Sequence, residues 1–193
     1  PIGPDLILTA RHVVAPKRRD PAHSLRVRWH CDFQRDPNTE WTALDEDALL
    51  WTGKGDLDAA LLRCPLPDAI RERSLGVVVD RRPKEGERWS SRGYARACRC
   101  TQAREFGDFG GTVREMGDDP FFEIVEDAQP DREADWRGAS GMPVSSVNGV
   151  ILGIVKAVPA NFNAKKLFAV PVWRMLKDPV FRSHACHQTR LVE

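Results

Sequence analysis

Cysteine is scarce in this sequence, and its distribution does not suit a disulfide framework. The chain has 193 residues and five cysteines: Cys31, Cys64, Cys98, Cys100 and Cys186. Secreted disulfide-rich domains carry an even number of cysteines at close spacings, so this odd, scattered set argues against that class. Only one residue separates Cys98 from Cys100, which is too few for the paired ligands of a zinc knuckle. A metal site joining this pair to His184, Cys186 and His187 is the lesser alternative, and we expect neither a metal nor a cofactor.

Long apolar runs and an excess of one charge are also lacking. No apolar run approaches the roughly 18 residues of a membrane helix, and the sequence begins without a signal-peptide pattern. The 29 basic and 28 acidic residues leave a formal net charge of +1. The longest basic run, "PKRRD" at residues 16–20, predicts a solvated loop rather than a nucleic-acid patch. With 41% hydrophobic residues, we expect a folded globular protein that binds neither nucleic acid nor membrane.

What the sequence does contain is a series of short apolar segments separated by Gly, Pro, Asp or Asn. Most are rich in Val, Ile, Leu and Phe, and each is about as long as a strand. They are residues 5–10, 24–29, 58–64, 75–80, 88–95, 111–116, 121–126, 142–147, 149–158 and 166–172. This pattern predicts an all-β fold of about ten to twelve strands, arranged as a sandwich or as a pair of barrels.

Helical and turn patterns are few. The best helix is "PVWRMLKD" at residues 171–178, which has a proline at its first position and is expected to end before Pro179. Residues 68–75 predict one or two helical turns. The glycine-rich stretch "EFGDFGGT", residues 105–112, does not follow a phosphate-binding pattern, and we interpret it as a structural turn.

Two candidate catalytic residues lie at the ends of predicted strands. His12 follows the apolar strand and Ala10, where its ring could face a cleft, although this motif taken alone favours a surface histidine or one satisfied by its neighbours. Asp58 precedes an apolar run and should be partly buried, and a buried carboxylate needs a partner such as an imidazole N–H. Asp56 stays a competitor for that role, and a turn-capping aspartate is the alternative for Asp58.

A third candidate, Ser140, lies in "WRGASGMPVSS", residues 136–146. Gly138 lets the backbone approach a ligand closely, and a suitable turn would point the N–H groups of Gly138 and Ser140 into one space. Such a space is an oxyanion hole, which is often the largest contribution to acyl-transfer catalysis. The alternative is an ordinary glycine-containing turn. The three candidates lie in the order His, Asp, Ser in an all-β chain, each at a strand end or turn, and in that arrangement a base, its orienting acid and a nucleophile can converge.

On these residues the chain resembles the chymotrypsin-fold (trypsin-like) serine peptidases. The resemblance rests on "TARHV" around His12, "DAALL" from Asp58, "GASGMPV" around Ser140 and "GVILGIVKA" at residues 149–157. It implies two packed six-stranded β-barrels with a short C-terminal helix, in one peptidase domain with lobes of about residues 1–75 and 76–193. It also implies that Ser140 attacks the scissile carbonyl, His12 is the base, Asp58 orients it, and the N–H groups of Gly138 and Ser140 bind the oxyanion.

The departures from this family are informative. Ala139 stands where secreted members have an aspartate that pairs with a newly cut N-terminus, so activation by such a cut is not expected. The substrate-binding strand has Lys156, Ala157 and Val158 in place of glycines, which argues against a deep primary pocket. Asp135 falls near the implied pocket floor, where it would favour a basic residue, or else it faces water. One or two strands that normally precede the histidine are not seen in the sequence.

The resemblance favours the intracellular bacterial branch, whose peptidase domains are joined to sensor or effector modules, some in antiviral defence. We therefore expect a cytoplasmic serine endopeptidase with a protein or peptide substrate, regulated by a partner or a fused module. A catalytically idle protease-fold module that binds a partner is the main alternative. A third hypothesis is an active fold held off until a partner reshapes the glycine-rich loop around Ser140.

Overall fold

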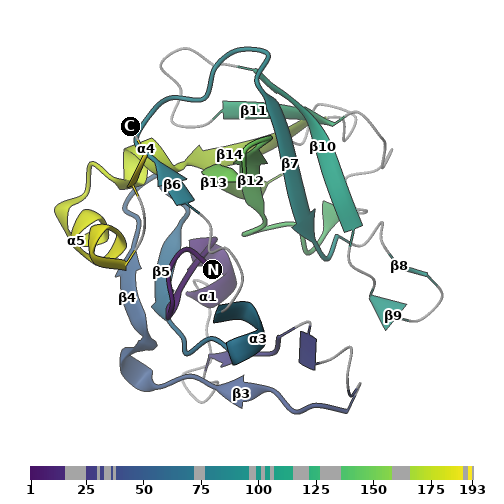
Figure 1. Ribbon diagram of the computed structural model, residues 1–193, viewed down its shortest axis with the longest axis vertical. Coiled ribbons are helices and arrows are strands. Elements are labelled where there is room, and N and C mark those ends of the chain that lie inside the picture. Colours follow the sequence, from purple (N-terminus) through teal and green to yellow (C-terminus); the bar gives the residue numbers. More distant parts are fainter. Residues whose placement is uncertain are drawn as a thin grey trace.

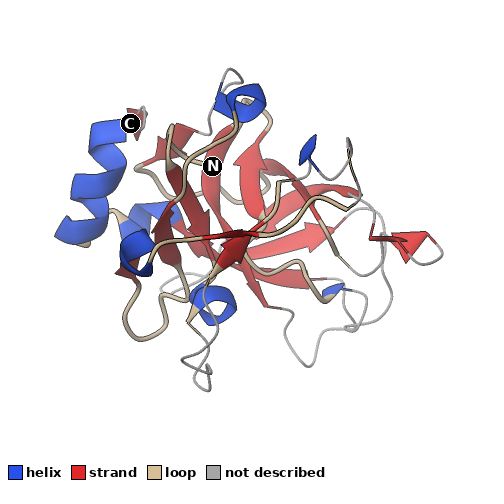
Figure 2. Ribbon diagram, turned by 90° about the horizontal axis from the view of Figure 1, so that it is seen from below, coloured by secondary structure: helices blue, strands red, loops and turns tan. Residues whose placement is uncertain are grey.

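The computed structural model describes residues 1–15, 25–29, 31–32, 36, 38–71, 77–95, 99–100, 103–104, 107–114, 122–126, 136–157, 166–188 and 191–192. Strands predominate, and the few helices are short (Figures 1 and 2). The strands are β1 (Leu6–Thr9), β2 (Arg26–Val27), β3 (Thr42–Ala43), β4 (Leu49–Thr52), β5 (Ala60–Arg63), β6 (Val77–Val79), β7 (Arg88–Gly93), β8 (Arg99–Cys100), β9 (Ala103–Arg104), β10 (Gly107–Arg114), β11 (Phe122–Glu126), β12 (Pro143–Ser146), β13 (Val150–Ala157), β14 (Lys166–Pro171) and β15 (Leu191–Val192). The helices are α1 (Arg11–Val14), α3 (Asp68–Arg71), α4 (Val172–Met175) and α5 (Pro179–Gln188), with a 3-10 turn at Glu46–Ala48.

Six strands close into an antiparallel barrel in the C-terminal part of the chain. They pair in the order β12, β7, β10, β11, β14, β13, and β13 pairs again with β12 to complete the ring. One core cluster draws an apolar residue from each of the six strands: Trp89, Val113, Ile124, Val144, Leu152 and Leu167. Two short strands, β6 and β15, extend the sheet in parallel beside β13. Barrel closure therefore fixes the strands on either side of the loop that carries Ser140.

The N-terminal strands form a smaller sheet, in the order β1, β5, β4, and a separate ribbon of β2 and β3. Strand β5 is buried on both faces: Ala60 and Leu62 belong to a cluster with Val14, whereas Leu61 belongs to a different cluster. A strand that is buried on both faces has a continuous apolar sequence. This explains the unbroken "AALL" at residues 59–62, directly after Asp58.

A second core cluster joins the N-terminal sheet to the barrel. Leu8 and Leu61 pack in it with Ile154 of β13 and with Phe181 of α5. The ring of Phe181 lies 4.8 Å from the ring of Trp51, between centroids. In Figure 1 the small sheet and α1 accordingly lie against one side of the barrel, with α5 beside β4. The strands β1 and β5, and with them the residues after β1 and before β5, are thus packed against the barrel through this shared cluster.

The all-β class with a short C-terminal helix is confirmed, but two local predictions were wrong. Of the predicted turn at residues 105–112, residues 107–112 are strand instead, because β10 begins at Gly107 and pairs with both β7 and β11, while residues 105 and 106 lie outside the described residues. A Cβ on Gly110 would lie 3.1 Å from the Trp89 carbonyl oxygen, so its glycine serves a close approach between strands.

The second error concerns Pro179, which starts a helix rather than ending one. The predicted helix at residues 171–178 is only the single turn α4, and the longer α5 follows it. The Asp178 carboxylate accepts the backbone N–H of Val180 at 2.9 Å, as an N-cap residue does, and proline is favoured immediately after such a cap. Within the described residues, the helices are all too short or too polar to cross a membrane.

Candidate active site

The predicted base and acid lie side by side at the edge of the N-terminal sheet. His12 stands in the one-turn helix α1 directly after β1, and Asp58 lies in the turn that leads into β5. The two strands pair with each other, Thr9 opposite Ala60, so their ends meet. This register brings together two residues that are far apart in the sequence.

Two hydrogen bonds hold this pair. The backbone N–H of His12 donates to Asp58 Oδ1 at 3.0 Å, and the ring atom Nδ1 of His12 lies 2.5 Å from Oδ2. An ionised carboxylate only accepts hydrogen bonds, so Nδ1 carries the proton and Nε2 is left as the acceptor. The Asp58 side chain is 9% exposed, whereas that of His12 is 49% exposed. Asp56, the competing acid, is exposed and contributes only its carbonyl, which accepts the N–H of Asp58.

Glycines give the loop before β12 its shape. Gly138 has a φ of +93°, and a Cβ there would lie 2.6 Å from the backbone oxygen of Tyr94. Gly141 has a φ of +85°, and a Cβ there would lie 2.4 Å from Thr9 Oγ1. Both positions therefore require glycine, for conformation and for space. The contact with Thr9 also places the Ser140 loop directly against the end of β1, three residues before His12.

Backbone N–H groups alternate between used and unused along this loop. The N–H of Ala139 donates to the Trp136 carbonyl at 2.9 Å, and that of Gly141 donates to the Val155 carbonyl at 2.8 Å. Within the described part of the chain, the N–H groups of Gly138 and Ser140 have no acceptor. These two are the groups predicted to form the oxyanion hole, and the fold leaves them open for an incoming acceptor.

The Ser140 hydroxyl does not contact His12 in this structure. It donates to the carbonyl oxygen of Lys156 at 3.3 Å. Strand β13 has a bulge there: Val155 and Ala157 pair with neighbouring residues of β14, which leaves Lys156 as the extra residue. The bulge is the feature that presents this carbonyl to Ser140. Sequence reasoning had singled out Lys156 for its side chain and missed the carbonyl.

Three proteases are among the solved structures that share this fold. The active form of the Rv3671c protease from M. tuberculosis superposes with a TM-score of 0.59 at 19% identity, covering 100% of this chain and 74% of that one. A serine endoprotease from Yersinia pestis gives 0.59 at 17% identity, over 94% of this chain and 55% of that one. Tobacco etch virus protease with bound product superposes with a TM-score of 0.53 at 17% identity, covering 92% of this chain and 68% of that one. The chain has the chymotrypsin fold. No family profile matches the sequence, and no curated protein matches it either.

Within this chymotrypsin fold, the predicted substrate-binding residues are only partly described. Asp135 and Val158 lie outside the described residues, as does the side chain of Ala157, whose backbone pairs with Phe168. Lys156 is half-buried. The roles of these four residues in substrate binding stay predictions.

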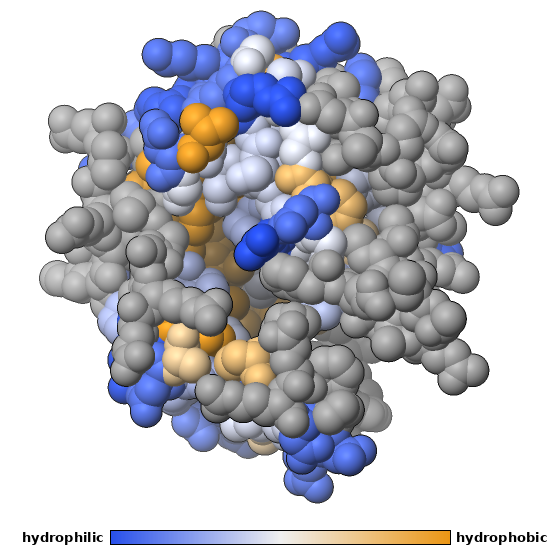
Figure 3. Space-filling view, turned by 45° about the vertical axis from the view of Figure 1, so that its right-hand side comes forward, coloured by the Kyte–Doolittle hydropathy of each residue, from blue (hydrophilic) through white to orange (hydrophobic). Residues whose placement is uncertain are grey.

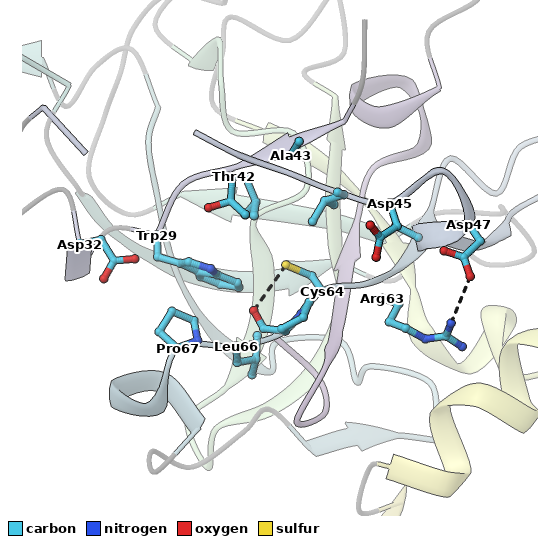
Figure 4. A pocket seen from close by; sticks show the side chains of 14 residues that line it. Trp29, Asp32, Thr42, Ala43, Asp45, Asp47, Arg63, Cys64, Leu66 and Pro67 are labelled. Atoms are coloured by element: carbon cyan, nitrogen blue, oxygen red, sulfur yellow. Dashed lines mark hydrogen bonds and ion pairs between the residues drawn. The ribbon is translucent and has the colours of Figure 1, made fainter. Parts of the chain in front are cut away.

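The surface has two hollowed regions. A cavity of about 420 Å³ opens in the N-terminal part of the chain, between Trp29, Asp45 and Cys64, and none of the three candidate catalytic residues lines it (Figure 4). Figure 3 shows a face that is hollowed, with hydrophobic residues in its depth and hydrophilic residues on its rim. Among the described residues, no three His, Cys, Asp or Glu side chains are grouped to hold a metal ion.

Proposed function

We propose that the chain is a serine endopeptidase that cleaves a protein or peptide substrate through Ser140, His12 and Asp58. The observation that carries this proposal is the buried Asp58 carboxylate bonded to Nδ1 of His12 at 2.5 Å, beside a loop with two open N–H groups. An acid that fixes the tautomer of a half-exposed imidazole, next to a serine and open donors, is the arrangement that acyl transfer needs.

In the proposed reaction, Nε2 of His12 accepts the hydroxyl proton while Ser140 Oγ bonds to the substrate carbonyl carbon. The carbonyl oxygen becomes an oxyanion, and the N–H groups of Gly138 and Ser140 bind it. Nε2 then gives the proton to the leaving nitrogen as the C–N bond breaks, which leaves an acyl-enzyme. Water, deprotonated by the same Nε2, attacks the ester, and the proton returns to Ser140 Oγ.

The first step requires the Ser140 hydroxyl to turn from the Lys156 carbonyl towards His12. This turn includes a rotation about the Cα–Cβ bond of Ser140, which breaks its hydrogen bond to Lys156. We include in the proposal that a partner or a fused module controls this step. A catalytically idle binding module is the second candidate, and the hydrogen bond between Ser140 and Lys156 is the observation that favours it.

A fluorophosphonate probe separates the two candidates without knowledge of the substrate. The probe requires an activated serine and a working oxyanion hole. We expect the wild-type chain to be labelled, Ser140→Ala to lose all labelling, and Ser145→Ala, a half-buried serine of β12, to keep it. Absence of labelling in the wild type, repeated with any longer natural form of the protein, would establish the idle module instead.

A further inference from the structure

Arg11, the residue before His12, makes contacts that the proposed roles do not account for. Its guanidinium donates one hydrogen bond to the carbonyl of Gly53 and another, at 3.1 Å, to the carbonyl of Gly55. Its Nε lies 3.9 Å from Asp58 Oδ1. The side chain is 34% exposed, so about two thirds of it is removed from water. These contacts all point into the turn between β4 and β5.

That turn determines where Asp58 lies. Gly53 donates its N–H to the Ala59 carbonyl at 2.8 Å, which closes the turn around Asp58. Two carbonyls of the turn, at Gly53 and Gly55, are held by one planar guanidinium that belongs to α1. Arginine suits this task because its fork of donors reaches several acceptors in a fixed geometry. The helix that carries His12 is thereby fastened to the turn that carries Asp58.

The same guanidinium compensates the charge of the buried carboxylate. Asp58 is 9% exposed, and a buried anion is costly unless donors and positive charge surround it. Oδ2 faces the His12 ring, while Oδ1 faces the His12 backbone N–H and Arg11 Nε. Arg11 therefore supplies positive charge on the side of the carboxylate away from the imidazole.

We propose that Arg11 is a positioning residue that fixes the Asp58 carboxylate against His12 by clamping the turn at residues 53–55. The inference rests on the proposed peptidase function for its kinetic consequence, but its structural consequence is independent of it. Without Arg11, the turn and the carboxylate move relative to α1, and the imidazole loses its fixed orientation.

The kinetic test uses a fluorophosphonate probe on the whole protein, with separate measurement of probe affinity and of the inactivation rate constant. We expect Arg11→Gln to lower the rate constant about 10-fold to 100-fold and to leave affinity unchanged, because misplacement of a catalytic group has effects of this size. Arg11→Lys keeps the charge but has a single ammonium in place of the planar fork, so its rate should lie between those of the wild type and Arg11→Gln. Arg63→Gln is the control: it removes an arginine of β5 paired at 3.6 Å with exposed Asp47, and should label like the wild type.

A spectroscopic measurement separates failure of this proposal from failure of the peptidase proposal. The proton on His12 Nδ1, shared with Asp58, gives a downfield NMR signal whether or not the protein labels. We expect the signal to shift or disappear in Arg11→Gln and to be unchanged in Arg63→Gln. The proposal is overturned if the wild type is labelled and the NMR signal is unchanged in Arg11→Gln. It is also overturned if Arg11→Gln and Arg11→Lys lower the labelling rate constant equally. If Arg11→Gln does not fold, Arg11→Lys decides: an unchanged rate and signal overturn the proposal.

Discussion

The two halves of the candidate site differ in how completely their polar groups are paired. On the N-terminal sheet, both carboxylate oxygens of Asp58 are engaged, one by the ring of His12 and one by its backbone N–H. On the barrel side, the N–H groups of Gly138 and Ser140 have no acceptor among the described residues, and the Ser140 hydroxyl points to Lys156. We call the side with His12 and Asp58 the paired half. We call the Ser140 loop, whose two N–H groups have no acceptor among the described residues, the open half.

Physical chemistry explains why the two halves are built differently. A buried carboxylate must be paired when the chain folds, because an unpaired one would destabilise the native state by several kcal/mol. Donors that are to bind a transition state must instead stay unpaired until substrate arrives. Gly138 is exposed, so water can solvate its N–H in the meantime at little cost. The difference between the halves therefore follows from the proposed chemistry.

Replacing the acid should produce the largest effect, because it breaks the paired half. In Asp58→Asn the side-chain amide can donate to Nδ1, which places the imidazole proton on Nε2, where it cannot accept the serine proton. We expect the rate of fluorophosphonate labelling to fall about 10,000-fold with the fold intact. Asp56→Asn, two residues away and exposed, should label normally. A loss of this size in Asp56→Asn, with labelling retained in Asp58→Asn, would reassign the acid to Asp56.

Distorting the open half should have the next largest effect. Gly138→Ala places a Cβ 2.6 Å from the Tyr94 carbonyl oxygen at a φ of +93°, so the loop must shift and take the N–H of residue 138 with it. We expect a labelling rate about 100-fold to 1,000-fold lower, as for the loss of one oxyanion donor.

Gly149→Ala is the matched control for this loop. It also has a positive φ, +75°, but a Cβ there meets nothing within 4 Å. It should lower the free energy of unfolding by about 1 kcal/mol and leave labelling unchanged. Labelling of Gly138→Ala at the rate of Gly149→Ala would show that the loop does not form the oxyanion hole.

The sequence predicted the paired half better than the open half, and the reason is physical. His12 and Asp58 each adjoin a short apolar run, and these runs alone indicate that the two residues lie at strand ends. The direction of the Ser140 hydroxyl depends on the bulge at Lys156, which arises from the register between β13 and β14 and leaves no pattern in one strand. The contacts of Arg11 likewise join residues more than forty positions apart, through a turn whose closure no local propensity specifies.

The smallest effect is expected far from both halves, in the connection between β6 and β7. Glu87 accepts two hydrogen bonds from Arg81, at 2.6 and 2.9 Å, and one from the Lys84 backbone N–H at 3.0 Å. The bonds from Arg81 are the main reason that the pKa of Glu87 is lowered from its ordinary value of 4.5. A lowered carboxyl pKa stabilises the fold above the unfolded-state value, and that stabilisation is lost as the pH falls through the folded-state value.

Glu87→Gln should therefore lower the free energy of unfolding by about 1 kcal/mol near neutral pH, and the difference from wild type should shrink as the pH falls below 4.5, the ordinary pKa of this carboxyl. Urea unfolding at several pH values measures this difference in free energy. Fluorophosphonate labelling of Glu87→Gln near neutral pH should match that of the wild type. Asp108→Asn is the control, because its pair with Arg92 is exposed on both sides. A difference between Glu87→Gln and wild type that stays constant with pH would show that the carboxylate charge is not what stabilises this connection. Slower labelling would show that the connection is coupled to the open half of the site.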